Sequence, residues 1–211
     1  RGLLDRAAMK VAITGGIGVG KSFVCCLLHD RGVQVYDCDH AAKRLMATDA
    51  PLRSELQAAV GEELYINNVL QKGLLARFIL SSEANKRLVE GIVHPYVARD
   101  FERSGMDWME AAVLFEARFD ERVALDYVVC VTAPDDVRVA RVMQRDHIGR
   151  DKAMEWIRCQ MSQDEIRRRS DFEIVNDGLN DLAPQLDLLL RSLEDERKRR
   201  FRIIRNNRNI K

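Results

Sequence analysis

The sequence predicts an α/β fold in which a doubly wound parallel sheet carries an inserted helical lobe and a short helical lid. Three observations predict this fold. A short β-branched run, residues 10–14, leads directly into a glycine-rich segment at 15–22. Apolar runs of strand length then alternate with amphipathic helical stretches, as they do in parallel sheets covered by helices. A mostly helical block at residues 37–103 interrupts this alternation, which indicates an inserted lobe.

The N-terminal part of the chain predicts a parallel strand–helix–strand unit. Residues 10–14 are short, apolar and β-branched, so we expect them to form the first strand. Residues 23–31 have the composition of a helix, which Gly32 would end as a C-cap. Residues 33–36 form the second predicted strand. A helix between two strands of this length is typical of a parallel sheet.

The remaining core elements come after the helical block, whose breaks are expected near Pro51, Gly61 and Gly73. Proline is common at the first position of a helix, so we expect a helix to begin at Pro134. The elements that we predict are a strand at 111–115, a strand at 127–131, a helix from 134 to about 145, a last strand at 172–175 and a closing amphipathic helix at 182–196.

These elements predict three functional parts and two ends. The inserted block would form a helical lobe on the core, and the segment rich in arginine around Gly149 would form a mobile lid. The predicted boundaries are 9–48, 108–140 and 170–196 for the core, 49–107 for the helical lobe, 141–169 for the lid, and 1–8 and 197–211 for flexible ends.

The glycine-rich segment carries the strongest chemical signal. The motif G-x-x-x-x-G-K-[ST] is complete at Gly15, Gly20, Lys21 and Ser22, between a predicted strand and a predicted helix. Its glycines let backbone N–H groups turn toward phosphate oxygens, and the helix N-terminus adds partial positive charge. Lys21 would bridge the outer phosphates of ATP, and the Ser22 hydroxyl would bind the Mg²⁺ that arrives with the nucleotide. We call residues 15–22 the P-loop.

A P-loop occurs in kinases, switch GTPases and ATPase motors, so further signals are needed. The guanine-reading N-K-x-D motif is missing, because Leu88 stands where its aspartate belongs in the segment 85–88. Residues 146–149 match D-x-x-G but follow a helix rather than a strand. A switch GTPase is therefore disfavoured. Another P-loop small-molecule kinase, such as a nucleoside monophosphate kinase, stays open as an alternative.

An acidic pair follows the second predicted strand. Asp37 and Asp39 lie at its carboxyl end, where open α/β sheets place their ligands. A carboxylate there can accept the proton of a hydroxyl that attacks the γ-phosphate. Both aspartates could instead cap the following helix. We expect one of them to act directly, with Asp39 ahead of Asp37.

Six segments together resemble the dephospho-CoA kinase family, over residues from about 9 to 193. They are TGGIGVGKS at 14–22, VYDCD at 35–39, HP at 94–95, LFE at 114–116, QM at 160–161 and NDG at 176–178. The resemblance implies ATP-dependent phosphorylation of the ribose 3′-hydroxyl of dephospho-CoA, which gives coenzyme A and ADP. It also implies that Asp39 is the catalytic base and that His94 lies near the acceptor substrate.

The sequence departs from the family pattern at three positions. Phe23 follows Ser22 where threonine is usual, and Ala112 stands where proline usually precedes the L-L-F-E-like segment. Lys72 stands in the helical lobe where an arginine is common in the family, whose lobe binds the acceptor (the acceptor lobe). Lysine keeps the positive charge but lacks the guanidinium group that can bind a phosphate with two hydrogen bonds. None of these changes removes a group that the chemistry requires. We therefore keep Lys72 among the expected acceptor-binding residues.

Arginines and polar strand ends complete the predicted site. Arg141 and Arg145 share a helix face, and Arg150 follows in the predicted lid, so they can neutralise phosphate charge as the lid closes. Glu116 at the end of the predicted third strand either holds Mg²⁺ through water or binds the acceptor lobe. The expected catalytic residues are Lys21, Asp39 and Arg145; the expected nucleotide-binding residues are Gly16, Gly18, Val19, Gly20, Lys21, Ser22, Phe23, Arg141, Arg150 and Asn176; the expected acceptor-binding residues are Asp39, Lys72, His94 and Glu116.

Composition limits the remaining possibilities. The net charge of +1 averages an acidic body and a basic tail, since residues 197–211 hold eight basic and no acidic side chains. Such a tail raises nucleic-acid binding as an alternative, which we do not expect to be the main function. No apolar run approaches the roughly 20 residues of a membrane span. Five cysteines without a paired spacing fit a reducing compartment, so we expect a soluble cytoplasmic protein that is a monomer or a weak oligomer.

Overall fold

The computed structural model describes residues 9–208, which form two compact units. The sheet unit comprises residues 9–35, 107–113 and 124–208, and the helical unit comprises residues 36–106 and 114–123. Compared with the predicted boundaries, the helical unit starts earlier and also takes in the segment after the third core strand. Each unit has its own buried core, and each is described in turn.

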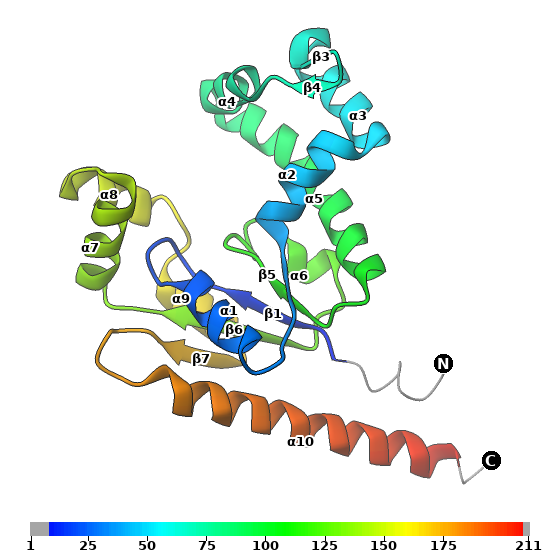
Figure 1. Ribbon diagram of the computed structural model, residues 1–211, viewed down its shortest axis with the longest axis vertical. Coiled ribbons are helices and arrows are strands. Elements are labelled where there is room, and N and C mark those ends of the chain that lie inside the picture. The colour runs from blue at the N-terminus through cyan, green and yellow to red at the C-terminus, as the bar shows by residue number, and fades with distance from the viewer. Residues whose placement is uncertain (1–8, 209–211) are drawn as a thin grey trace. The chain divides into compact units, whose positions relative to one another are not determined.

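The sheet unit is built on a parallel sheet with the strand order β2-β5-β1-β6-β7 (Figure 1). Val11 of β1 pairs with Trp108 of β5 on one side and with Tyr127 of β6 on the other. The chain therefore leaves β1 toward one edge and later returns on its other side, which creates a topological switch point at β1. This arrangement confirms the predicted α/β fold. The strands are β1 (Val11–Thr14), β2 (Val35–Asp37), β5 (Trp108–Glu110), β6 (Tyr127–Thr132) and β7 (Phe172–Val175).

Five helices accompany this sheet, and two of them bury its core. Helices α1 and α10 contact each other and pack leucine and valine side chains against β1 and β6. Leu28 of α1 and Leu186 of α10 are fully buried there, and each such side chain contributes roughly 1.5–3 kcal/mol. The helices are α1 (Lys21–His29), α7 (Asp135–Asp146), α8 (Arg150–Arg158), α9 (Gln163–Arg168) and α10 (Leu182–Arg208).

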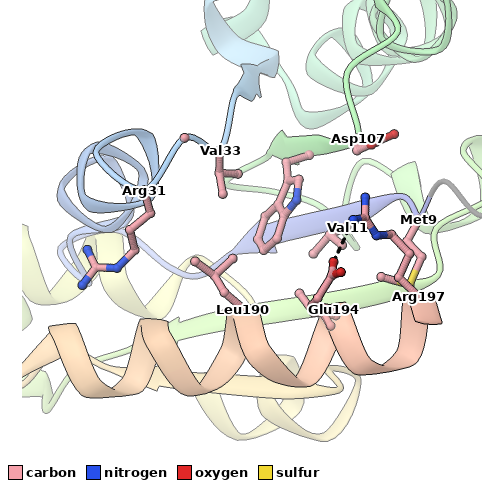
Figure 2. Close-up of a pocket in the computed structure, with 11 residues that line it drawn as sticks. Met9, Val11, Arg31, Val33, Asp107, Leu190, Glu194 and Arg197 are labelled. Carbon is pink, nitrogen blue, oxygen red and sulfur yellow. Dashed lines mark ion pairs between the residues drawn. The ribbon is translucent and has the colours of Figure 1, made fainter. Parts of the chain in front are cut away.

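Helix α10 is longer than predicted, because it continues past residue 196 to Arg208 and includes most of the segment that we predicted as a flexible end. Acidic residues one turn earlier pair with the first basic ones, with Arg197 2.9 Å from Glu194. Arg200 pairs with Asp126, at the start of the β6 region. Figure 2 shows Glu194 and Arg197 at the rim of a cavity of about 400 Å³ beside Val11, the first residue of β1. Residues 1–8 and 209–211, also predicted as flexible, lie outside the described residues.

The helical unit is organised around α5, which contacts α2, α3, α4 and α6. Apolar side chains at a spacing of four residues, Val89, Val93, Val97 and Phe101, are buried along it. A small hairpin that we did not predict turns at Asn67 and Asn68, both with positive φ, as hairpin turns require. The elements are α2 (Cys38–Thr48), α3 (Ala50–Val60), a 3₁₀ helix η1 (Glu62–Leu64), β3 (Tyr65–Ile66), β4 (Val69–Leu70), α4 (Lys72–Ser81), α5 (Glu83–Ser104) and α6 (Phe119–Arg122).

One predicted strand is wrong. The third core strand is β5, at Trp108–Glu110, whereas the predicted segment 111–115 is not a strand. Leu114 and Phe115 are buried, so their apolar character reflects packing and not pairing in the sheet. The breaks expected near Pro51, Gly61 and Gly73 are confirmed, because α2 ends at Thr48, α3 spans Ala50–Val60 and α4 begins at Lys72. Within the described residues, no helix is long and apolar enough to cross a membrane.

Candidate active site

The P-loop connects the end of β1 at Thr14 to the start of α1 at Lys21. Gly18 and Gly20 adopt φ values of 81° and 86°, a region that favours glycine. The space is also limited, because a Cβ at Gly20 would lie 2.4 Å from the amide nitrogen of Asn176. The first N–H groups of a helix have no partner within it. Those of α1 are therefore available to an anion at this end of β1.

Lys21 lies within the loop that precedes it. Its side chain is only 11% exposed, and its Nζ donates a hydrogen bond to the carbonyl oxygen of Gly15 at 2.7 Å. Burial lowers the pKa of Lys21, and the nearby carboxylate of Glu110 partly offsets that effect. A phosphate group would supply the negative charge that stabilises this buried ammonium group.

Glu110 is a site residue that the sequence reasoning missed. It ends β5, pairs in register with Ile13 of β1, and places its Oε1 atom 3.9 Å from Nζ of Lys21. We expected Glu116 at this strand end, because the strand was predicted too late in the sequence. Glu116 instead lies in the turn region of the helical unit, where it is exposed. The alternation Trp108-Met109-Glu110, with a buried methionine between half-buried neighbours, is the signal that could have located the strand.

Asn176 and Arg141 donate hydrogen bonds to backbone carbonyl oxygens of the P-loop. The Asn176 side chain is buried and donates to the carbonyl oxygen of Val19 at 2.8 Å. Arg141 donates to the carbonyl oxygens of Gly18 and Val19, each at 3.3 Å, and to Asn176 at 3.4 Å. The structure therefore brings both predicted residues to the P-loop. In this arrangement the Asn176 amide supports the backbone of the loop.

The side chains of three other predicted nucleotide-binding or catalytic residues, Arg145, Arg150 and Phe23, are exposed. Arg145 is exposed and pairs with its neighbour Asp146 at 2.7 Å, which lowers the pKa of that carboxyl group. Arg150 is exposed at the first position of α8. Phe23 is 58% exposed on α1, and its N–H donates to the carbonyl oxygen of Gly20 at 3.1 Å.

The two aspartates after β2 have different environments within the helical unit. Asp37 is the N-cap of α2 and accepts a hydrogen bond from the backbone N–H of His40 at 2.8 Å. Asp39 lies in the first turn of α2 with its side chain 76% exposed, 2.5 Å from Nζ of Lys43. The capping role thus falls to Asp37, and Asp39 keeps a carboxylate that faces solvent.

A polar cluster fixes the start of α2 to α5 in the same unit. The Tyr36 hydroxyl donates to Asp100 at 2.6 Å, and Arg44 pairs with the same carboxylate. Burial is the main cause that raises the pKa of Tyr36, so this hydroxyl keeps its proton. Asp39 is therefore carried on a helix whose first turns are anchored at both Tyr36 and Arg44.

The remaining predicted acceptor residues also lie in the helical unit. His94 is half-buried on α5, with its ring 5.2 Å from that of Phe119. Burial, with a smaller contribution from Arg122, lowers the pKa of His94 to about 4, so its imidazole is neutral at pH 7. Lys72 is exposed at the first position of α4.

A parallel sheet with a glycine loop at its switch point, followed by lysine and serine at a helix N-terminus, defines a P-loop protein of the nucleoside-triphosphate-binding class. A family model for dephospho-CoA kinase matches residues 9–181. The chain belongs to the dephospho-CoA kinase family.

Individual relatives agree with this assignment. The chain is 42% identical to a dephospho-CoA kinase of Bacteroides fragilis, covering 85% of this chain and 90% of the relative. It is 37% identical to one of Salinibacter ruber, covering 82% and 91%. Among solved structures, TT1252 from Thermus thermophilus is similar with a TM-score of 0.71 at 29% identity, covering 89% of this chain and 97% of that one. The dephospho-CoA kinase from Campylobacter jejuni, with a TM-score of 0.59 at 17% identity, supports the fold; 90% of this chain and 97% of that one are covered.

Proposed function

We propose that this chain transfers the γ-phosphoryl group of ATP to the ribose 3′-hydroxyl of dephospho-CoA, which gives coenzyme A and ADP. Membership of the dephospho-CoA kinase family supports the substrate and the reaction. The observation that carries the phosphoryl-transfer chemistry is the buried Lys21 ammonium group beside the loop backbone at the end of β1. Family membership also favours this reaction over that of a nucleoside monophosphate kinase.

On the nucleotide side, we assign the binding of the phosphates to the backbone of the P-loop. The N–H groups of Gly18, Gly20, Lys21 and Ser22 would donate to phosphate oxygens. Gly16 and Val19 would shape the turn, since the N–H of Val19 donates to the carbonyl oxygen of Gly16 at 3.4 Å. Lys21 would leave the Gly15 carbonyl oxygen and donate to the outer phosphates. Arg145 would leave Asp146 and neutralise charge that develops on the transferred group, while Arg141 and Arg150 complete the basic surroundings.

Magnesium fits the donor set near Lys21. The Ser22 hydroxyl and the Glu110 carboxylate are hard oxygen ligands, which Mg²⁺ prefers together with phosphate oxygens and water. We propose that Ser22 holds the ion directly and that Glu110 holds it through water. When bound, Mg²⁺ would neutralise charge on the β- and γ-phosphates.

On the acceptor side, Asp39 is the proposed base. Asp39 would release Lys43 and bind the hydroxyl group of the acceptor instead. Its exposed carboxylate would then accept the proton of that hydroxyl as it attacks. His94 is neutral, so its ring can donate and accept one hydrogen bond each with the acceptor. Lys72 and Glu116 would supply further polar contacts.

The proposed activity is tested by acceptor dependence. ATP consumption in the presence of Mg²⁺ should require dephospho-CoA and should yield one CoA for each ADP. The matched controls are AMP and CMP at the same concentration. ADP release that does not depend on dephospho-CoA, or that AMP supports equally well, would overturn the assignment.

The role of Glu110 gives a separate prediction. Glu110→Gln keeps the size of the side chain but removes the charge that would orient the water around Mg²⁺. We expect the Mg²⁺ concentration at half-maximal activity to rise about 10- to 100-fold, the range for outer ligands of a metal site. Glu116→Gln, at an exposed position of the helical unit, is the control and should leave this concentration unchanged. An unchanged Mg²⁺ dependence in Glu110→Gln would exclude the role.

We also propose that the protein works in a reducing compartment, the cytoplasm. The five cysteines of the sequence have no paired spacing, and Cys38 and Cys130 are buried. Cysteines without a disulfide framework are typical of compartments where glutathione and thioredoxin keep thiols reduced.

A further inference from the structure

The Gln160-Met161 pair belongs to the segments that resemble the dephospho-CoA kinase family, yet the proposed chemistry gives it no role. Gln160 lies in the connection between α8 and α9. Its Oε1 atom accepts a hydrogen bond from the backbone N–H of Ile17, in the middle of the P-loop, at 2.7 Å. A residue of the predicted lid segment therefore contacts the phosphate loop directly.

Arg138 of α7 binds the backbone carbonyl group of Ile17. Its Nε atom donates to the carbonyl oxygen of Ile17 at 3.0 Å, and its Nη1 atom is 3.1 Å from Asp135. The Arg138 side chain is only 4% exposed. Both backbone groups of Ile17 are thus bound by side chains from outside the loop, and its N–H is not available to a phosphate.

Two glycines that the P-loop motif does not require fit this arrangement. A Cβ at Gly16 would lie 2.5 Å from Nη2 of Arg138 and 3.2 Å from Oε1 of Gln160. A Cβ at Gly18 would lie 2.7 Å from the carbonyl oxygen of Arg138. The loop can approach the side chains of Arg138 and Gln160 at Gly16, and the backbone of Arg138 at Gly18, only because both positions lack a Cβ.

We propose that Arg138 and Gln160 are positioning residues that clamp Ile17 and hold the P-loop in its phosphate-binding shape. Preorganised N–H groups bind a phosphate without the cost of ordering the loop. With both backbone groups of Ile17 held, the N–H groups of Gly18, Gly20, Lys21 and Ser22 would keep the positions from which they can donate to phosphate. This inference deepens the proposed function and rests on it for the identity of the nucleotide.

The contact with Ile17 also stabilises the buried charge of Arg138. Among the described residues, its Nη2 atom is one of the buried side-chain atoms that lack a hydrogen-bond partner, and burial lowers the pKa of the guanidinium group. A buried charge is costly unless it is paired and hydrogen-bonded. The Ile17 carbonyl oxygen and the Asp135 carboxylate provide this compensation, so displacing Ile17 would leave the charge less well satisfied.

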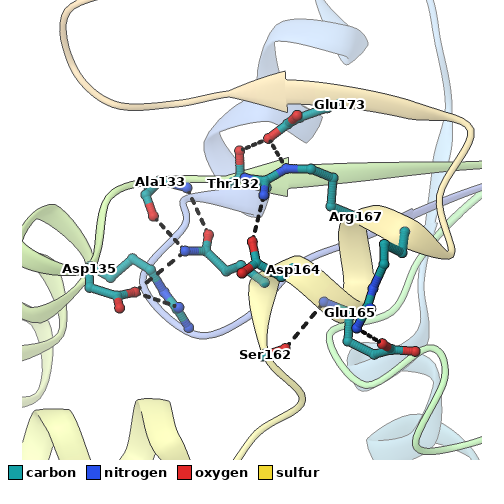
Figure 3. A network of polar contacts seen from close by, with 11 residues as sticks. Thr132, Ala133, Asp135, Ser162, Asp164, Glu165, Arg167 and Glu173 are labelled. Carbon is teal, nitrogen blue, oxygen red and sulfur yellow. Dashed lines mark hydrogen bonds and ion pairs between the residues drawn. The ribbon is translucent and has the colours of Figure 1, made fainter.

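Further hydrogen bonds attach the clamp to the end of β6. Gln163 donates to the carbonyl oxygen of Ala133 at 2.9 Å and to Asp135 at 3.4 Å, and the N–H of Ala133 donates back to Gln163 at 3.0 Å (Figure 3). Asp135, which binds Arg138, is therefore fixed by a contact to the sheet. The support of Ile17 does not depend on a single exposed ion pair.

The test is ADP binding to the full-length protein, measured by calorimetry, because ADP needs the P-loop but no acceptor. Gln160→Met keeps the length of the side chain and removes the acceptor oxygen. We expect ADP to bind about three- to tenfold more weakly, the effect of one net hydrogen bond. The KM of ATP should rise with it, and the KM of dephospho-CoA should not change.

Two further variants distinguish positioning from general stability. Gln160→Glu keeps an acceptor oxygen, and the adjacent Arg138 guanidinium offsets its charge, so ADP affinity should return to within about twofold of wild type. Gln144→Met, at an exposed position of α7, is the matched control and should bind ADP normally. A lower Tm with unchanged ADP affinity in Gln160→Met would overturn the proposal, as would an equal loss in Gln144→Met.

A double-variant cycle tests whether the two side chains act as one clamp. Arg138→Met should also weaken ADP binding, but the double variant should lose less than the product of the two single effects, because both residues hold Ile17. Independent effects would contradict the shared role. If wild type binds ADP but shows no turnover with dephospho-CoA, the proposed reaction fails, while the binding results still decide the clamp.

Discussion

Asp39→Asn should reduce kcat about 10²- to 10⁴-fold, the range for removing a general base. The amide keeps the shape of the side chain and one acceptor oxygen but cannot take a proton from the attacking hydroxyl. Because Asp39 would act on the acceptor hydroxyl and not on the phosphates held by the P-loop, the KM of ATP should change little. Steady-state kinetics with each substrate varied in turn measures both quantities.

Asp37 is the matched control for this prediction, since it is an aspartate two positions earlier with a capping role. Asp37→Asn keeps a good N-cap and should retain most of the turnover. Asp37→Ala should lower the free energy of unfolding by about 1 kcal/mol through loss of the cap, with kcat largely retained. Turnover near the wild-type value in Asp39→Asn would remove Asp39 as the base, and a loss of kcat in Asp37→Asn would reverse the assignment.

Local signals allowed the phosphate loop and most of the sheet to be predicted from sequence. The strand, the glycines, Lys21 and Ser22 are contiguous, so the motif and its structural context are read together. The predicted ranges of the strands β1, β6 and β7 agree closely with the observed ones, and β1 and β6 are short apolar runs buried within the sheet. Such runs are the pattern that buried parallel strands produce.

The error at β5 arose because burial was taken for strand pairing. Ala111, Leu114 and Phe115 are as buried as sheet residues, but the latter two pack in the helical unit. The true strand has three residues and ends in a glutamate, so its apolar signal is weak. Moving the strand to residues 108–110 also moves the acidic strand end from Glu116 to Glu110, which changed the candidate for Mg²⁺ binding.

The support of the loop could not be predicted from local patterns. Gln160 and Ile17 are 143 positions apart, and Arg138 and Ile17 are 121 apart. Arg138 also appears on a helix with many charged residues, where a solvent-exposed arginine is the ordinary expectation. The two extra glycines, Gly16 and Gly18, were the only local indication that something packs closely against the loop.

Lys21→Met should lower kcat/KM by a factor on the order of 10² to 10³, the range for removing one group that stabilises transition-state charge. Methionine has a similar length and fills the same space, but it cannot donate to the outer phosphates. ADP affinity should fall as well, since the β-phosphate loses its nearest side-chain charge. Lys152→Met, at an exposed position of α8, is the control and should leave both quantities unchanged.

The lowered pKa of Lys21 adds a pH dependence that the variant should lack. Without nucleotide, burial brings the pKa of the ammonium group below its usual 10.5. Phosphate favours the charged form and raises that pKa again, so between the two values ADP binding takes up a proton. Wild-type ADP affinity should therefore decrease as the pH rises toward 10.5, and the calorimetric enthalpy should depend on the ionisation enthalpy of the buffer. Equal pH profiles for wild type and Lys21→Met would show that Lys21 does not titrate with binding.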